Sequence, residues 1–350
     1  MFKDSTVFIV GAGASYEFDM PLGAHLAKTI SSNLEWLSRD VEIYGRLRDK
    51  QTNSLIQHYA QTLPREQQDE VYQAARLIHE GIDHAMSIDA FIDMHADKPL
   101  VGAVGKLQIA LEILRAENNS KLALPRSSLG GFDWEMTKDS WLRVFSEILL
   151  EKSKSSAIDS IAEDLTIICF NYDRCIEHYL TYAVQRTFGI DWQEAYDHVS
   201  KIRIIHPYGD LGPLKSGATS RNSFGSLEGV DFWMASQRLS TFTEEVRDQD
   251  SLKEIRSAIA SAHQLVFLGF SFQPQNMALL RPDSDKRERK RRPAVYASAM
   301  GFHDVAKAEI VRRIRDVLRY EAHHLLDIEV MIDTTAYDLM RFNRLNLARS

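Results

Sequence analysis

The chain has 350 residues, 44% hydrophobic and 26% charged, a balance typical of a soluble globular protein with one large domain or two smaller ones. A formal net charge of −7 provides no overall basic field that would attract nucleic acid. Only two cysteines occur, Cys169 and Cys175, which excludes a disulfide framework and a four-cysteine zinc site. No signal peptide and no apolar span of roughly 18 residues is recognisable, so we expect a cytoplasmic protein without membrane contact.

The first clear structural signal lies close to the N-terminus, where residues 6–30 are predicted to form a strand, a glycine loop and a helix. The apolar run Val7–Val10 leads into the loop residues Gly11, Ala12, Gly13, Ala14 and Ser15. A buried strand that stops at glycines and turns into a helix offers backbone N–H groups to an anion such as a diphosphate. Taken alone, the motif fits an ordinary tight turn about equally well.

The character of the sequence changes between residues 31 and 154, where polar, helix-forming segments dominate. Helices are predicted over 64–86, 87–95, 104–116 and 139–152, with a loop over 125–131. No strand pair is recognisable in this stretch. We therefore predict a helical insertion over residues 31–154, within a core formed by residues 1–30 and 155–350.

Strand signals return after residue 160 and alternate with helical segments. Strands are predicted at 165–173, 201–206, 263–272, 293–299 and 327–333, with helices at 251–262 and 303–320 and a Ser/Gly/Asn-rich loop at 216–229. This alternation predicts an α/β fold: a Rossmann-like, mostly parallel sheet with helices on both faces and a large helical insertion.

Polar residues or glycines follow four of the apolar strands. These groups are Gly11–Ser15, Asn171–Asp173, His206–Gly209 and Gly269–Ser271. The carboxyl ends of strands in an open parallel sheet line one crevice, and ligands bind there. We therefore expect these sequence-distant groups to converge on one pocket.

The glycine loop departs from the fingerprint of a dehydrogenase. Tyr16 stands where the third glycine would be. An acidic residue should end a second strand about 20 positions later, but Glu35 lies in helical sequence. A phosphate cradle remains compatible with the loop, whereas hydride transfer gains no support.

Four motifs in this order and at this wide spacing resemble the sirtuin-like proteins: GAGAS with a proline-containing loop, FNYD, a strand-end histidine with a nearby glycine, and GFSF. The resemblance covers residues 7–23 and the segment from about residue 164 onward, and residues 31–154 match nothing that we can name. Within the family, the likeness is greatest to bacterial defence proteins that hydrolyse NAD when phage infection is sensed.

The resemblance implies a role for each matching residue. The cradle for the NAD diphosphate would be Gly11, Gly13, Ala14 and Ser15, with Ala12 in the same loop. Asn171 would help to position the attacking group beside the nicotinamide ribose, and Asp173 would bind or orient the same ribose. His206 would act as the general base, for which an imidazole with a pKa near neutrality is suited. Gly269 and Ser271 would line the phosphate and adenosine-ribose side.

The sequence also departs from the pattern of sirtuin deacylases. Those enzymes usually hold a structural zinc with two CxxC pairs, whereas neither cysteine here has a partner at that spacing, so no metal is expected. Pro207 and Tyr208 separate His206 from Gly209, which usually follows the histidine directly. No signature of a groove for an acyl-lysine peptide is recognisable, and these differences favour water as the acceptor.

Plainer interpretations exist for the individual residues. Asn171 and Asp173 are also good helix caps, His206 alone fits a buried, hydrogen-bonded histidine, and Ser271 fits a turn hydroxyl. The basic run Lys286–Arg292 favours a solvated loop or a contact with an acidic partner over nucleic acid. The helix over 87–95 fits ordinary packing better than a cover over the pocket.

The sequence thus predicts an NAD glycohydrolase that cleaves its substrate NAD to nicotinamide and ADP-ribose and depletes cellular NAD in anti-phage defence. Because constitutive activity would be toxic, we expect activation by a partner, such as a nucleotide-processing enzyme or a ring ATPase, or by homo-oligomer assembly. One alternative is an NAD-dependent protein deacylase or ADP-ribosyltransferase that uses the same site. Another is a non-catalytic module that binds NAD or ADP-ribose and signals.

Overall fold

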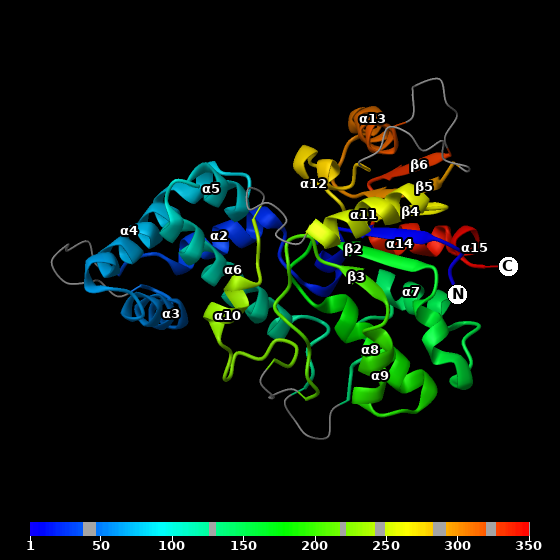
Figure 1. Ribbon diagram of the computed structural model, residues 1–350, viewed down its shortest axis with the longest axis horizontal. Coiled ribbons are helices and arrows are strands. Elements are labelled where there is room, and N and C mark those ends of the chain that lie inside the picture. The colour runs from blue at the N-terminus through cyan, green and yellow to red at the C-terminus, as the bar shows by residue number, and fades with distance from the viewer. Residues whose placement is uncertain are drawn as a thin grey trace.

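The computed structural model describes residues 1–37, 47–125, 131–217, 222–241, 249–282, 292–319 and 327–349. Its centre is one six-stranded sheet in the order β3-β2-β1-β4-β5-β6, at the right of Figure 1. The strands are β1 (Thr6–Val10), β2 (Leu165–Cys169), β3 (Arg203–Ile205), β4 (Gln264–Leu268), β5 (Ala294–Ala299) and β6 (Ile328–Ile332). Every neighbouring pair of these strands is parallel. All the strands predicted from sequence are confirmed.

The three central strands are buried along their whole length. Each position of β1, β2 and β4 is buried, as expected for parallel strands whose two faces are both covered. Their register pairs Val10 with Cys169 on one side and with Leu268 on the other. The three strands therefore end at the same level, and the residues that follow them meet at one edge of the sheet.

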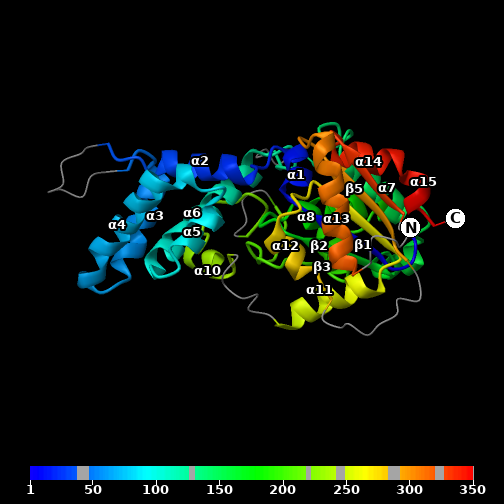
Figure 2. The ribbon, with the colours of Figure 1, turned by 90° about the horizontal axis from the view of Figure 1, so that it is seen from above.

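Helices cover both faces of the sheet, which confirms the predicted Rossmann-like α/β fold (Figure 2). On one face α7 (Trp141–Leu150) packs against α8 (Cys175–Phe188) and α14 (Ala336–Phe342). The other face carries α11 (Gln249–Ser261), α12 (Pro274–Leu279) and α13 (Lys307–Leu318). The shorter elements are α1 (Ala12–Ser15), α9 (Trp192–Val199), α15 (Arg344–Leu347) and the 3-10 turns Tyr16–Phe18, Ile82–His84, Ser155–Ala162 and Asp304–Ala306.

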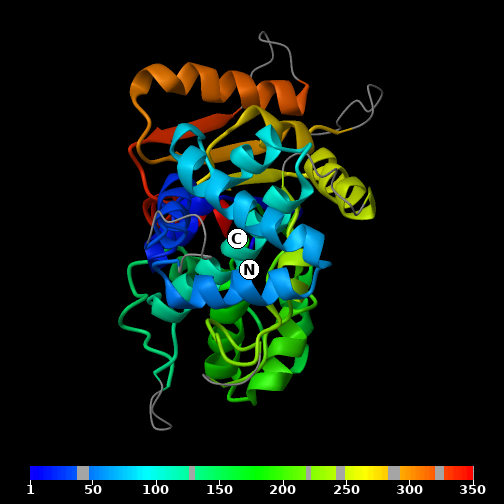
Figure 3. The ribbon, with the colours of Figure 1, turned by 90° about the vertical axis from the view of Figure 1, so that its left-hand side faces the viewer.

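A second group of helices, the helical lobe, lies beside the sheet in Figure 1 and faces the viewer in Figure 3. It contains α2 (Gly23–Asn33), α3 (Lys50–Gln61), α4 (Arg65–Gly81), α5 (Ile88–Met94), α6 (Pro99–Asn119) and α10 (Phe232–Gln237). Helix α6 packs against all the other helices of the lobe. It is buried on most of its circumference, which explains why so much of this helix is apolar.

The helices predicted between residues 31 and 154 are confirmed, and α3 is one that the sequence did not reveal. Helix α7 packs on the sheet with α14, whereas α3–α6 belong to the lobe. The division at residues 31 and 154 stays a prediction. No helix in the described ranges is long and apolar enough to cross a membrane. Of the basic run 286–292 only Arg292 falls within those ranges, and the loops predicted at 125–131 and 216–229 are described only in part.

Candidate functional site

The candidate site lies at the carboxyl edge of the sheet, at the point between β1 and β4 where the strand order reverses. From β1 the chain proceeds to β2 and β3 on one side, and from β4 to β5 and β6 on the other. In folds of this kind a crevice for ligands opens at that point. All four polar or glycine groups that the sequence places after strands belong to this edge.

At this edge, Gly11 and Gly13 after β1 pack directly against Gly269 after β4. A Cβ on Gly11 would lie 2.7 Å from the Gly269 carbonyl oxygen, and one on Gly13 would lie 2.9 Å from the Gly269 Cα. Gly269 has φ +55°, and its Cβ would lie 2.0 Å from the backbone nitrogen of Ala14. These positions therefore require glycine because the loops after β1 and β4 pack backbone against backbone.

For Gly11, Gly13 and Ala14, this packing corrects the expectation that the loop presents free N–H groups to an anion. The Gly11 N–H donates to the Leu268 carbonyl, the Gly13 N–H to the Gly269 carbonyl, and the Ala14 N–H to the Gly11 carbonyl, at 3.0, 3.0 and 2.9 Å. Three of the groups that a diphosphate would use are thus occupied by protein carbonyls. Ala12, which is half-buried, begins the short helix α1, and Ser15 ends it.

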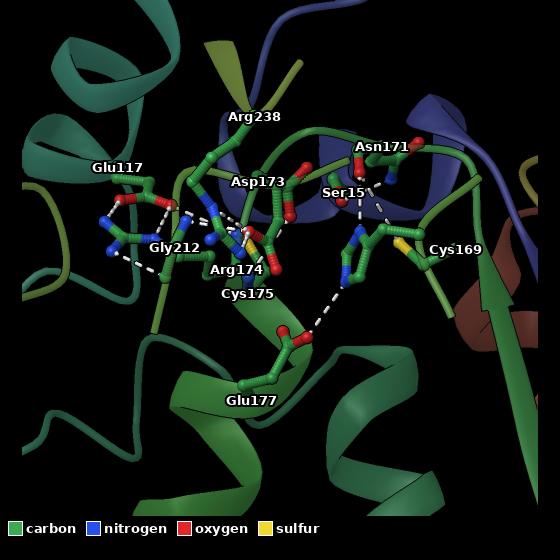
Figure 4. Close-up of polar contacts among 12 residues, drawn as sticks. Ser15, Glu117, Cys169, Asn171, Asp173, Arg174, Cys175, Glu177, Gly212 and Arg238 are labelled. Carbon is green, nitrogen blue, oxygen red and sulfur yellow. Dashed lines mark hydrogen bonds and ion pairs between the residues drawn. The ribbon is translucent and has the colours of Figure 1, made fainter. Parts of the chain in front are cut away.

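Asn171 connects the loops after three strands. Its side-chain Nδ2 donates a 2.8 Å hydrogen bond to Ser15 Oγ, and Figure 4 shows the two side chains facing each other. Its backbone carbonyl accepts a 2.9 Å hydrogen bond from His206 Nδ1. Ser15 and Asn171 are both buried. The structure therefore brings together three of the residues that the sequence singles out.

Asp173 lies in the same loop but is turned into the protein. It is buried, and its Oδ1 accepts a 3.2 Å hydrogen bond from the Cys175 N–H at the start of α8. Burial raises the pKa of the Asp173 carboxyl, and hydrogen bonds from Cys175 and Ser15 offset this only in part. This geometry fits the capping role of Asp173 at least as well as a contact with ribose.

The loop after β4 places its two candidate residues differently. The Gly269 N–H donates to Ser298 Oγ at 2.9 Å, which fixes the backbone at the end of the strand. Ser271 is exposed, two residues further along. Gly269 is thus part of the packed floor of the site, whereas Ser271 lies at the surface.

His206 has a second partner that the sequence did not reveal. Its Nε2 lies 2.9 Å from Glu177 Oε1, and the side chains of His206 and Glu177 are 7% and 20% exposed. Burial of the ring would by itself lower the pKa of His206, but the neighbouring Cys169 and the Glu177 carboxylate raise it well above the ordinary value. The neighbouring Cys169 thiol is buried, which raises its pKa and leaves it neutral near pH 7.

A residue of the helical lobe also reaches this loop. The hydroxyl of Tyr172, between Asn171 and Asp173, lies 2.5 Å from Asp89 Oδ1 and 3.0 Å from the Ser240 carbonyl oxygen. Burial raises the pKa of the Asp89 carboxyl, and the hydrogen bond that it accepts from the Tyr172 hydroxyl offsets this only in part. Helix α5 therefore contacts the loop that carries Asn171.

The start of α8 is held by a buried ion pair. Arg174 Nη2 lies 2.5 Å from Glu117 Oε2 at the end of α6, with side chains 3% and 0% exposed (Figure 4). Glu117 also accepts hydrogen bonds from the backbone N–H groups of Arg174 and Gly225. The guanidinium further donates to the Gly212 carbonyl at 3.3 Å. This pair ties the lobe to the segment that follows β3.

Two cavities flank the β3 side of the site. One of about 660 Å³ is lined by His206 and by residues of β3, and the other, of about 420 Å³, is lined by Glu177 and Tyr196. Asp210 and Arg238 line both cavities. Volumes of this size accommodate small ligands. Within the described part of the chain, no three His, Cys, Asp or Glu side chains are arranged to hold a metal ion.

Three residues of the site, Glu177, Asp89 and Glu117, were not predicted from the sequence. Glu177 comes four residues after Asp173, so a helix that begins directly after the FNYD motif places it within the first turn, near that motif. Asp89 and Glu117 come from helices of the lobe, more than fifty residues before Asn171 in the sequence. Only the packing of the lobe brings them to the site.

The sheet order, the glycine contact and the polar chain across three strand ends define a Rossmann-like α/β protein with a site at its switch point. Residues 165–317, from β2 almost to the end of α13, match the family model of the SIR2-like domain. This match supports a sirtuin-like family and suggests an NAD-related activity in general. It includes Asn171 and His206, while the glycine loop and most of the lobe lie outside it. No curated protein matches the chain.

Proposed function

We propose that this protein hydrolyses NAD to nicotinamide and ADP-ribose at the carboxyl edge of its sheet. The observation that carries the proposal is the hydrogen-bonded chain Ser15–Asn171–His206, which joins the loops after β1, β2 and β3. The SIR2-like match over residues 165–317 supports NAD as the molecule that is bound there.

In this reaction the bond between the ribose C1′ and the nicotinamide nitrogen breaks, and its electron pair neutralises the pyridinium. Positive charge then develops on the ribose, and water attacks C1′ as it gives up a proton. With Nδ2 of Asn171 fixed by Ser15, the amide can offer Oδ1 to the attacking water or to a ribose hydroxyl. A neutral His206 then accepts the proton.

One observation favours a second candidate, a module that binds NAD or ADP-ribose without cleaving it. Both ring nitrogens of His206 are hydrogen-bonded to protein atoms, so neither one can accept a proton in the arrangement described. Catalysis by His206 therefore requires one of these contacts to change.

Nicotinamide release from NAD by the purified protein tests the proposal, alone and with candidate partner proteins. We expect Asn171→Ala and His206→Ala to lower the rate at least about 100-fold, the usual scale for loss of a positioned acid or base. NAD binding should be at least partly retained in a direct binding assay. His58→Ala, an exposed histidine on α3, serves as the matched control.

If wild type never releases nicotinamide under any of these conditions but still binds NAD, hydrolysis is wrong and the binding module is favoured. Release that depends on an acylated peptide would instead indicate the deacylase or ADP-ribosyltransferase alternative.

We further propose that the reaction depletes cellular NAD during anti-phage defence, triggered by a nucleotide-processing enzyme, a ring ATPase or self-assembly. We expect total NAD to fall in infected cells that express wild type together with its genomic neighbours, and to stay constant with His206→Ala. Equal NAD in every pairing would contradict the depletion model.

A further inference from the structure

We propose that Glu177 is the positioning residue of this site: its carboxylate holds the His206 ring through Nε2 and prevents the ring from accepting a proton until a ligand displaces it. This inference rests on the proposed function in assigning a base role to His206. The hydrogen bonds from which the role of Glu177 is inferred do not depend on whether NAD is cleaved.

The proton positions on His206 follow from its two partners. A carbonyl oxygen can only accept, so the ring nitrogen Nδ1, 2.9 Å from the Asn171 carbonyl, must carry a proton. Nε2 faces Glu177 Oε1 at 2.9 Å, where a carboxylate requires a second proton on the ring. The ring is thus an imidazolium with no lone pair for a substrate.

Of the two contacts, the one to Glu177 is the more readily exchanged. The loop of Asn171 is held by the bond to Ser15 and by the 2.9 Å bond from the Phe170 N–H to the Val10 carbonyl. Glu177 is a flexible side chain whose second oxygen, Oε2, is buried without a hydrogen-bond partner. Turning this side chain away therefore breaks one hydrogen bond, whereas moving the Asn171 carbonyl disrupts the edge of the sheet.

The cavity of about 420 Å³ that Glu177 lines gives the carboxylate a place to go. The cavity is also lined by Arg174 and Arg238, which are paired with Glu117 and Asp210, so its walls are polar. His206 itself lines the larger cavity on the other side of β3. Displacement of Glu177 would therefore leave Nε2 accessible to a substrate hydroxyl or to water.

The other titratable groups around His206 do not replace Glu177. Burial raises the pKa values of the Cys169 thiol and the Asp173 carboxyl, so burial disfavours a negative charge on both groups. Asp210 is ionised, since the positive charges of His206 and Arg238 lower the pKa of its carboxyl despite burial. Its Oδ1 is already bonded to Arg238 at 2.8 Å and to the Gly212 N–H at 2.7 Å.

The proton transfers balance over one turnover. The Nε2 proton of His206 passes to the departing Glu177 carboxylate, which releases it to water in the cavity. The neutral ring then takes one proton from the water that attacks C1′, while the electron pair of the C1′–N bond leaves with nicotinamide. The ring is then cationic again, the return of Glu177 restores its hydrogen bond to Nε2, and the reaction releases one proton in total.

An NMR titration of His206 in the purified full chain tests this directly. The His206 resonance is assigned by its absence from the spectrum of His206→Ala. We expect Glu177→Gln to lower the pKa of His206 by at least about one unit, a tenfold change in proton affinity. Glu177→Asp, whose shorter side chain moves the carboxylate away from Nε2, should lower it by less. Glu194→Gln, an exposed residue of α9, should leave it unchanged.

The pH profile of nicotinamide release separates positioning from a merely structural role. The acidic limb should move to lower pH in Glu177→Gln by the same amount as the histidine titration. A rate that falls equally at every pH, or a His206 titration that does not move, would overturn the proposal. If wild type proves inactive, the proposed function fails, while the titration still decides whether Glu177 controls the charge of His206.

Discussion

At the scale of single residues, the glycines of the site act through packing as well as through any contact with phosphate. Gly269 has a left-handed backbone, and its missing Cβ makes room for the backbone of Ala14. The same loops bring Ser15 to Asn171. A substitution at Gly269 should therefore affect the free energy of unfolding more than it affects ligand binding.

We expect Gly269→Ala to lower the free energy of unfolding by about 2–4 kcal/mol, which combines left-handed backbone strain with overpacking. Gly301→Ala is the matched control, because Gly301 has φ +77° but nothing within 4 Å of its Cβ position. Strain alone should cost that variant about 1–2 kcal/mol. Urea unfolding measures both values, and equal losses would mean that the contact with Ala14 contributes nothing.

At the scale of elements, the local sequence pattern was sufficient to predict the strands and the polar groups that follow them. The apolar runs of β1, β2 and β4 are visible because both faces of these strands are buried, and the polar groups after them identify the carboxyl edge. Asn171 and His206 were found in this way. Helix α3, in which Thr52, Ile56, Tyr59 and Ala60 are buried, was not recognised from the sequence.

The rest of the site could not be predicted because it depends on how elements pack. The contact between Asp89 and Tyr172 joins helix α5 to a loop more than eighty residues away. The N–H groups of Gly11, Gly13 and Ala14, expected to be free, donate to carbonyls. Two of these carbonyls lie in β4 or in the loop that follows it, and the sequence of β1 carries no sign of this. The contact of His206 Nε2 with Glu177 likewise depends on packing, because the start of α8 sets the direction of Glu177.

At the scale of the whole molecule, the helical lobe and the sheet are joined beside the site by the Arg174–Glu117 pair. Glu117 is the third residue from the end of α6, where the helix dipole disfavours a negative charge. The guanidinium of Arg174 and the N–H groups of Arg174 and Gly225 compensate for this. The pair therefore specifies how the lobe, the start of α8 and the segment after β3 fit together.

Removing one partner of the Arg174–Glu117 pair should lower the free energy of unfolding more than replacing both partners. We expect Glu117→Ala to lower the free energy of unfolding by about 3–5 kcal/mol, because the Arg174 charge stays buried without its counter-charge. The double variant Glu117→Leu with Arg174→Met should lose less, since no charge remains buried. Glu35→Ala, which breaks the exposed pair with Arg48, should change stability by no more than about 1 kcal/mol. Chemical denaturation of the four proteins tests the order, and a double variant less stable than Glu117→Ala would show that the pair itself holds the lobe to the site.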